Sequence, residues 1–198
     1  MSGLHPARSE LILGGQRSGK SRRAELLARA WLNASGRHQA VLVATAQPWD
    51  DEMRQRIVRH QADRAKRVPG MTTVEVPLAL AEAIVELSTP DTLVVVDCLT
   101  LWLTNLLMPA SSEQISEDNR ADALVEYART ATLLIAIANA PGPVILVGNE
   151  IGMGVIPLGR EVRAFVDALG RLNQEVAATC PRVTLMAAGL PLTLKGTP

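Results

Sequence analysis

The amino-acid sequence predicts an α/β fold, with helices on both faces of a mainly parallel sheet. Unbroken apolar runs at 40–46, 92–96 and 144–147 are typical of strands that are buried on both faces. Segments of helical character separate these runs, which is the alternation found in parallel sheets. A glycine-rich turn joins the first apolar run to the first helical segment, and this turn is also the main indication of function.

The glycine-rich turn follows an apolar run at 11–13 and precedes a helix-forming segment at 22–30. It matches the P-loop pattern G-x-x-x-x-G-K-[ST] with Gly14, Gly15, Gln16, Arg17, Ser18, Gly19, Lys20 and Ser21. The glycines allow backbone N–H groups to point at phosphate oxygens, and the helix N-terminus adds its positive dipole end. In such a site Lys20 neutralises the outer phosphates and the Ser21 hydroxyl binds Mg²⁺. A chance match is the alternative, and the strand–turn–helix context argues for a nucleotide phosphate site.

The remaining elements continue the alternation. Strands are predicted at 40–46, 71–76, 92–97, 144–147 and 182–187, with a short edge strand at 192–194. Helices are predicted at 50–66, 78–87, 117–139 and 160–178, and 99–108 is either a helix or an extended segment. Acidic residues begin the helix at 50–66 and basic residues end it, as the helix dipole favours. Pro141 and Pro143 end the long helix, and polar residues at 109–117 form a loop before it.

The composition limits which binding partners and which cellular location we expect. Twenty Lys and Arg balance 20 Asp and Glu, so nucleic acid is not expected as a partner. No apolar stretch is long enough for a membrane span and no signal peptide is indicated, so we expect a cytoplasmic protein. Cys98 and Cys180 lie far apart, which favours buried thiols over a disulfide or a zinc site. We expect one domain over residues 1–198, with 1–9 as a flexible tail.

Two acidic residues are expected near the P-loop, because ligands of open α/β sheets bind at the carboxyl ends of the strands. Asp97 ends an apolar strand, where a carboxylate can hold Mg²⁺, and capping the next helix is the alternative. Glu150 lies near the start of a loop at 148–159 that contains four glycines and Pro157. That loop could contact metal or substrate, and an ordinary connecting loop is the alternative.

The helix at 50–66 carries a crowd of basic side chains on one broad face, and His60 lies among them. A solvated basic face is the common explanation of such a run. Positive neighbours disfavour the imidazolium cation, however, so His60 should stay neutral and nucleophilic. The arginines could then stabilise a phosphoryl or nucleotidyl group that passes to it. Spacing alone leaves both interpretations open.

The ordered set of motifs resembles the bifunctional adenosylcobinamide kinase/adenosylcobinamide-phosphate guanylyltransferase family. The resemblance covers residues 10–195 and rests on GGxRSGKS (14–21), ATAQ (44–47), DDEM (50–53), RIxxH (56–60), DCLTLWLxNLL (97–107), NEIGMG (149–154), RLNQ (171–174) and AGLPL (188–192). The P-loop alone would not select this family. A Leu-Gly pair at 158–159 departs from the more polar pair usual in the family, and Met71 stands where tryptophan is common.

The resemblance implies a fold, two reactions and a set of site residues. The implied fold is that of RecA-like P-loop NTPases, assembled as a homotrimer. ATP or GTP would phosphorylate the corrinoid adenosylcobinamide, and GTP with Mg²⁺ would then transfer GMP through a covalent intermediate on His60. The implied nucleotide-binding positions are the P-loop, Thr45, Ala46, Gln47, Gln61, Ala62, Asp63, Arg64, Glu75 and Asp97.

Two rival functions remain at this stage. A small-molecule P-loop kinase without guanylyl transfer would leave His60 idle. A nucleotide-binding regulatory module would hydrolyse or sense nucleotide without an acceptor. The P-loop fits all three functions, so His60 is the residue that discriminates between them.

Overall fold

The structure is a computed structural model, which describes residues 4–48, 51–108 and 119–197. Within these residues a seven-stranded sheet has the order β3-β2-β4-β5-β1-β6-β7. The strands are β1 (Ser9–Gly14), β2 (Gln39–Ala44), β3 (Met71–Glu75), β4 (Thr92–Asp97), β5 (Val144–Val147), β6 (Arg182–Ala187) and β7 (Leu190–Lys195). All neighbouring strands are parallel except β7, which pairs antiparallel with β6. The predicted mainly parallel sheet is therefore confirmed.

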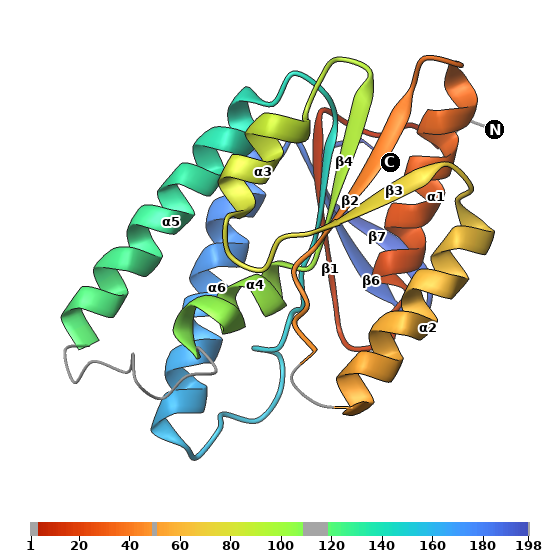
Figure 1. Ribbon diagram of the computed structural model, residues 1–198. Helices are drawn as coiled ribbons and strands as arrows, with labels where there is room; N and C mark the ends of the chain where they lie inside the picture. Colours follow the sequence, from red (N-terminus) through yellow and green to blue (C-terminus); the bar gives the residue numbers. More distant parts are fainter. Residues whose placement is uncertain (1–3, 49–50, 109–118, 198) are drawn as a thin grey trace.

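Helices cover both faces of this sheet, as predicted (Figure 1). They are α1 (Lys20–Ala34), α2 (Asp51–Arg67), α3 (Leu80–Leu87), α4 (Leu99–Leu107), α5 (Asn119–Asn139) and α6 (Arg160–Thr179). The open alternative at 99–108 is settled as helix α4. The polar loop predicted at 109–117 lies outside the described residues.

The core has two layers, one on each face of the sheet, and successive residues of the central strands point to opposite layers. Leu11 packs in a cluster that includes side chains of α3, α4, α5 and α6. Its neighbour Ile12 points to the other face, in a cluster with Ala24, Leu27 and Ala28 of α1. Because both faces are covered, the central strands are apolar throughout, and this produced the unbroken runs seen in the sequence.

The first strand begins two residues earlier than the apolar pattern suggested. Ser9 and Glu10 are almost fully buried in β1. The Glu10 carboxylate is satisfied there by Arg23 at 3.3 Å, Arg182 at 3.4 Å and the Thr184 hydroxyl at 2.8 Å. A buried acid with such donors is tolerated inside a sheet, so polar residues continue the strand. The predicted flexible tail over 1–9 is therefore wrong at Ser9.

The last two strands form a hairpin that the sequence only partly predicted. Strand β7 begins at Leu190, not at 192, and its register places Leu190 opposite Ala187. Ala188 and Gly189 make the turn with φ angles of 50° and 80°. Positive φ at both central positions is the geometry of a tight hairpin turn. This turn lies at the same edge of the sheet as the P-loop.

Within the described part of the chain, no helix combines the length and apolar character that crossing a bilayer requires.

Candidate active site

The P-loop forms a tight backbone cradle between β1 and α1. Gly14 has a φ of 152°, and a Cβ atom there would lie 2.5 Å from the Met186 carbonyl oxygen and 2.6 Å from Ser18 Oγ. Gly19 has a φ of 104° and directly precedes α1. The buried Ser18 Oγ has no hydrogen-bond partner among the described residues. A cradle that excludes side chains and holds an unsatisfied hydroxyl fits the phosphates of a nucleotide.

Lys20 lies across this cradle as the first residue of α1. Its side chain is buried, and Nζ donates a hydrogen bond of 2.7 Å to the Gly15 carbonyl. The ammonium group therefore already lies over the backbone that would surround the phosphates. Ser21 follows in the same helical turn and is half-buried.

The β6–β7 turn supports the P-loop from the side. The Gly189 N–H donates to the Ser18 carbonyl at 3.0 Å. A Cβ atom at Gly19 would lie 3.3 Å from Gly189 Cα, so the absence of a side chain at Gly19 permits the close approach. The supporting role of this hairpin could not be read from the sequence, because 170 residues separate Gly19 from Gly189 along the chain.

Thr45 joins the ends of β2 and β4 beside the cradle. Its fully buried hydroxyl donates to the Cys98 carbonyl at 2.7 Å and accepts from the Cys98 N–H at 2.8 Å. Asn105 donates to the Thr45 carbonyl at 2.8 Å. The hydroxyl thus ties two strand ends together, and nucleotide binding by Thr45, Ala46 or Gln47 stays a prediction.

Asp97 ends β4 at the same edge, half-buried. The residue that caps α4 is Cys98, so the capping alternative for Asp97 does not hold. Carboxylate and hydroxyl oxygens are ligands that suit Mg²⁺, so Asp97 and Ser21 fit this ion chemically. No group of three or more His, Cys, Asp or Glu side chains gathers in the described residues.

Arg64 of α2 reaches the neighbourhood of Asp97 from the outer layer. Its guanidinium donates to Thr73 Oγ1 at 3.1 Å and is almost fully buried. Burial lowers the pKa of Arg64, while the charges of Asp97 and Glu25 act to raise it. Its hydrogen bond to Thr73 ties α2 to the edge strand β3.

His60 belongs to α2, as predicted, but its side chain lies outside the described residues. Gln61 and Ala62 are exposed on the same helix, and Glu75 is exposed at the end of β3. Among the described residues, neither Gln61 nor Glu75 makes a side-chain hydrogen bond or ion pair. Their predicted contacts with a nucleotide stay predictions, as does the role of Asp63, which lies 3.4 Å from Arg67.

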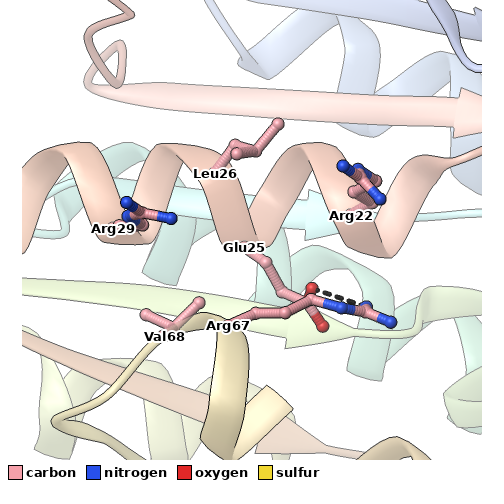
Figure 2. Close-up of a pocket in the computed structure, with 6 residues that line it drawn as sticks. All are labelled: Arg22, Glu25, Leu26, Arg29, Arg67 and Val68. Atoms are coloured by element: carbon pink, nitrogen blue, oxygen red, sulfur yellow. Dashed lines mark hydrogen bonds and ion pairs between the residues drawn. The ribbon is translucent and has the colours of Figure 1, made fainter. Parts of the chain in front are cut away.

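An ion pair connects the P-loop helix with the helix that carries His60. Arg67 of α2 donates to Glu25 of α1 at 3.0 Å (Figure 2). The pair borders a shallow pocket of about 150 Å³, which is also lined by Arg22, Leu26, Arg29 and Val68. The sequence analysis did not predict this pair. The available signal was Glu25, an acidic residue that lies among the buried apolar residues Ala24, Leu27 and Ala28 of α1 and therefore needs a partner.

The loop at 148–159 starts directly against the P-loop. The Gly148 N–H donates to the Ile12 carbonyl at 3.0 Å, and the Glu150 N–H donates to the Gly14 carbonyl at 3.2 Å. The Glu150 carboxylate accepts from the Gly152 N–H at 3.1 Å. The sequence-based grouping of this loop with the P-loop is thus confirmed for its backbone. A contact of Glu150 with metal or substrate stays a prediction.

Comparison with known proteins agrees with this geometry. The family model "Cobinamide kinase / cobinamide phosphate guanyltransferase" matches residues 10–194. The bifunctional adenosylcobalamin biosynthesis protein CobP of Pseudomonas aeruginosa is 44% identical, over 96% of this chain and 98% of its own length. The corresponding protein CobU of Escherichia coli is 35% identical, over 93% of this chain and 98% of its own.

A solved structure supports the fold alone. The flagellar accessory protein FlaH from Methanocaldococcus jannaschii superposes with a TM-score of 0.51 at 15% identity, over 99% of this chain and 82% of its own. The fold is therefore the P-loop NTPase fold that the sequence predicted. The nearly full-length match to the family model and the two curated relatives show that the chain belongs to the cobinamide kinase / cobinamide phosphate guanyltransferase family.

Proposed function

We propose that this protein catalyses two consecutive transfers to one corrinoid. ATP or GTP first phosphorylates the aminopropanol hydroxyl of adenosylcobinamide. GTP then donates GMP to that phosphate, which yields adenosylcobinamide-GDP and pyrophosphate. The phosphate cradle at Gly14–Lys20 is the observation that carries the proposal, because both transfers begin with a bound triphosphate. Family membership supplies the acceptor.

In the first transfer the chain's task is to hold and neutralise the triphosphate. Backbone N–H groups of the P-loop and Lys20 bind the outer phosphates, so that the γ-phosphorus faces the acceptor hydroxyl. The hydroxyl oxygen bonds to phosphorus, the bond to the β-phosphate oxygen breaks, and the hydroxyl proton leaves to solvent. Mg²⁺, held by Ser21, Asp97 and the phosphates, would supply additional positive charge for the leaving group.

In the second transfer His60 acts as the nucleophile. The neutral imidazole attacks the α-phosphorus of GTP, pyrophosphate leaves, and a phosphoramidate bond holds GMP on the protein. An oxygen of adenosylcobinamide phosphate then attacks the same phosphorus, and the imidazole is released. The covalent intermediate thus divides one nucleotidyl transfer into two displacements. We assign recognition of guanosine to Gln61, Ala62, Asp63, Arg64, Glu75 and Asp97 and to residues 45–47.

The proposal also includes the assembly and the setting of the enzyme. We propose a homotrimer that acts in the cytoplasm, with the chain as a single catalytic domain. Sedimentation of the purified protein would measure the number of protomers directly.

The test is incubation with Mg²⁺ and GTP labelled at either the α- or the γ-phosphate. We expect covalent label from the α-phosphate only, labile in acid and stable in base, as a phosphoramidate is. His60→Ala should abolish that label and preserve phosphorylation of adenosylcobinamide. His38→Ala is the matched control, because His38 stacks on Trp31 with a centroid distance of 3.6 Å in another part of the fold.

Each contrary result would point to a different function or to a different nucleophile. Phosphorylation of the acceptor without any covalent label would identify a monofunctional kinase. Nucleotide binding without either reaction would identify a regulatory module. Full labelling of His60→Ala would assign the nucleophile to another residue.

A further inference from the structure

The loop at 148–159 exposes an unusual amount of apolar surface. Val155 and Leu158 are 96% and 97% exposed, and Met153 and Ile156 are also largely exposed. No charged residue occurs between Ile151 and Leu158. A contiguous apolar patch on a folded protein usually marks a binding surface, because exposing apolar side chains to water costs free energy.

The backbone of this loop is held at both ends, so the exposure does not come from a loose connection. At the entry, the Asn149 N–H donates to Thr100 Oγ1 at 2.9 Å, and Asn173 donates to the Asn149 carbonyl at 3.0 Å. At the exit, Arg163 donates to the carbonyls of Pro157 and Leu158. The apolar side chains between these anchors are presented to solvent by a supported loop.

The loop also leaves from the phosphate cradle itself. Its entry hydrogen-bonds to β1 through Gly148 and to Gly14 through Glu150. Figure 1 shows both the loop and the turn between β1 and α1 at the lower edge of the sheet. An acceptor whose hydroxyl reaches the γ-phosphate must place the rest of its body beside this cradle. A large acceptor therefore needs a surface in this region.

We propose that the segment 151–158 is the surface on which the corrin ring of the acceptor lies, an inference that rests on the proposed function. The ring is broad and flat, with methyl groups and neutral carboxamides at its rim. An uncharged apolar loop matches the methyl groups. Gly152 and Gly154 carry no side chains, and nothing lies within 4 Å of a Cβ built at Gly154. A flat ring can therefore approach the backbone, whose N–H and carbonyl groups match the carboxamides.

The test is the double variant Val155→Ser with Leu158→Ser. Both side chains are almost fully exposed, so their replacement should leave folding intact. Val85→Ser on α3 is the matched control, since Val85 is 69% exposed on another element. Affinity for adenosylcobinamide without nucleotide is measured by equilibrium dialysis, alongside GTP affinity, covalent labelling by α-labelled GTP and molar mass by light scattering.

We expect the double variant to bind adenosylcobinamide at least tenfold more weakly, because the apolar contacts of two side chains are lost. The control should change by less than twofold. GTP affinity, covalent labelling and molar mass should stay as in the wild type. The KM for the acceptor should rise while kcat at saturation is preserved.

Several results would overturn the proposal. Unchanged affinity for adenosylcobinamide, in a wild type that binds and phosphorylates it, would reject the loop and leave the proposed function standing. A changed molar mass in the double variant would assign the surface to a second copy of the chain. A wild type that binds no adenosylcobinamide would reject the proposed function together with this inference.

Discussion

The ion pair between Glu25 and Arg67 offers the sharpest test of how the two functional helices are joined. The Glu25 side chain is 9% exposed, whereas that of Arg67 is 46% exposed. Arg67 also lies 3.4 Å from Asp63, within its own helix. Removal of Arg67 leaves a nearly buried charge without its partner, whereas removal of the Glu25 charge leaves a half-exposed one. The two single variants should therefore differ in stability.

The magnitudes follow from burial. Arg67→Ala leaves a nearly buried carboxylate without its hydrogen-bond donor, which for a fully buried pair costs about 3–5 kcal/mol. Arg64 lies near enough to Glu25 to compensate part of this charge, and solvent reaches the site of Arg67. We therefore expect a loss of about 2 kcal/mol in the free energy of unfolding. Glu25→Gln keeps the volume and leaves Arg67 with Asp63 and water, so we expect a loss of about 0.5–1 kcal/mol.

Urea unfolding followed by circular dichroism measures both losses. Arg29→Ala is the control, because Arg29 lines the same pocket (Figure 2), and we expect a change below about 0.5 kcal/mol there. Since α2 carries His60, Arg67→Ala should also slow covalent labelling by GTP more than it slows phosphorylation. Equal losses in the two variants, or a larger loss for Glu25→Gln, would refute the reasoning from burial.

Four further predictions concern the cradle, the cation and the thiols. Lys20→Ala should slow both transfers on the order of 10²-fold or more, measured as kcat/KM with each nucleotide; unchanged rates would remove the P-loop from the mechanism. Gly14→Ala should abolish nucleotide binding in dialysis and destabilise the fold by about 1–3 kcal/mol, since the added Cβ meets a backbone carbonyl at 2.5 Å. Asp97→Asn should raise the Mg²⁺ concentration for half-maximal phosphorylation roughly tenfold. Burial raises the pKa of the Cys98 and Cys180 thiols from 9.0 to about 11, so a thiol reagent at pH 8 should react only after unfolding. Stability should fall as pH rises from about 9 to 11, because the unfolded thiols ionise first.

Much of the fold could be predicted from local sequence. The apolar runs at 92–96 and 144–147 are unbroken because β4 and β5 are buried on both faces, so their character follows from composition alone. The edge strand β3 is mostly exposed, so its sequence lacks the unbroken apolar run of the central strands. The P-loop was predictable because its function depends on the backbone conformations of consecutive residues, and these are encoded by the glycines themselves.

What the sequence by itself determined was thus the alternation of strands and helices, the phosphate cradle, and the family motifs. Only the tertiary structure decided which distant residues complete them. Glu10 could enter a strand because Arg182 and Thr184 come from β6, and Gly189 supports the P-loop from a hairpin near the other end of the chain. The pairing of Glu25 with Arg67 likewise depends on how α2 packs against α1. Such contacts leave little local pattern, because their energy depends on the packing of elements that are far apart in the sequence.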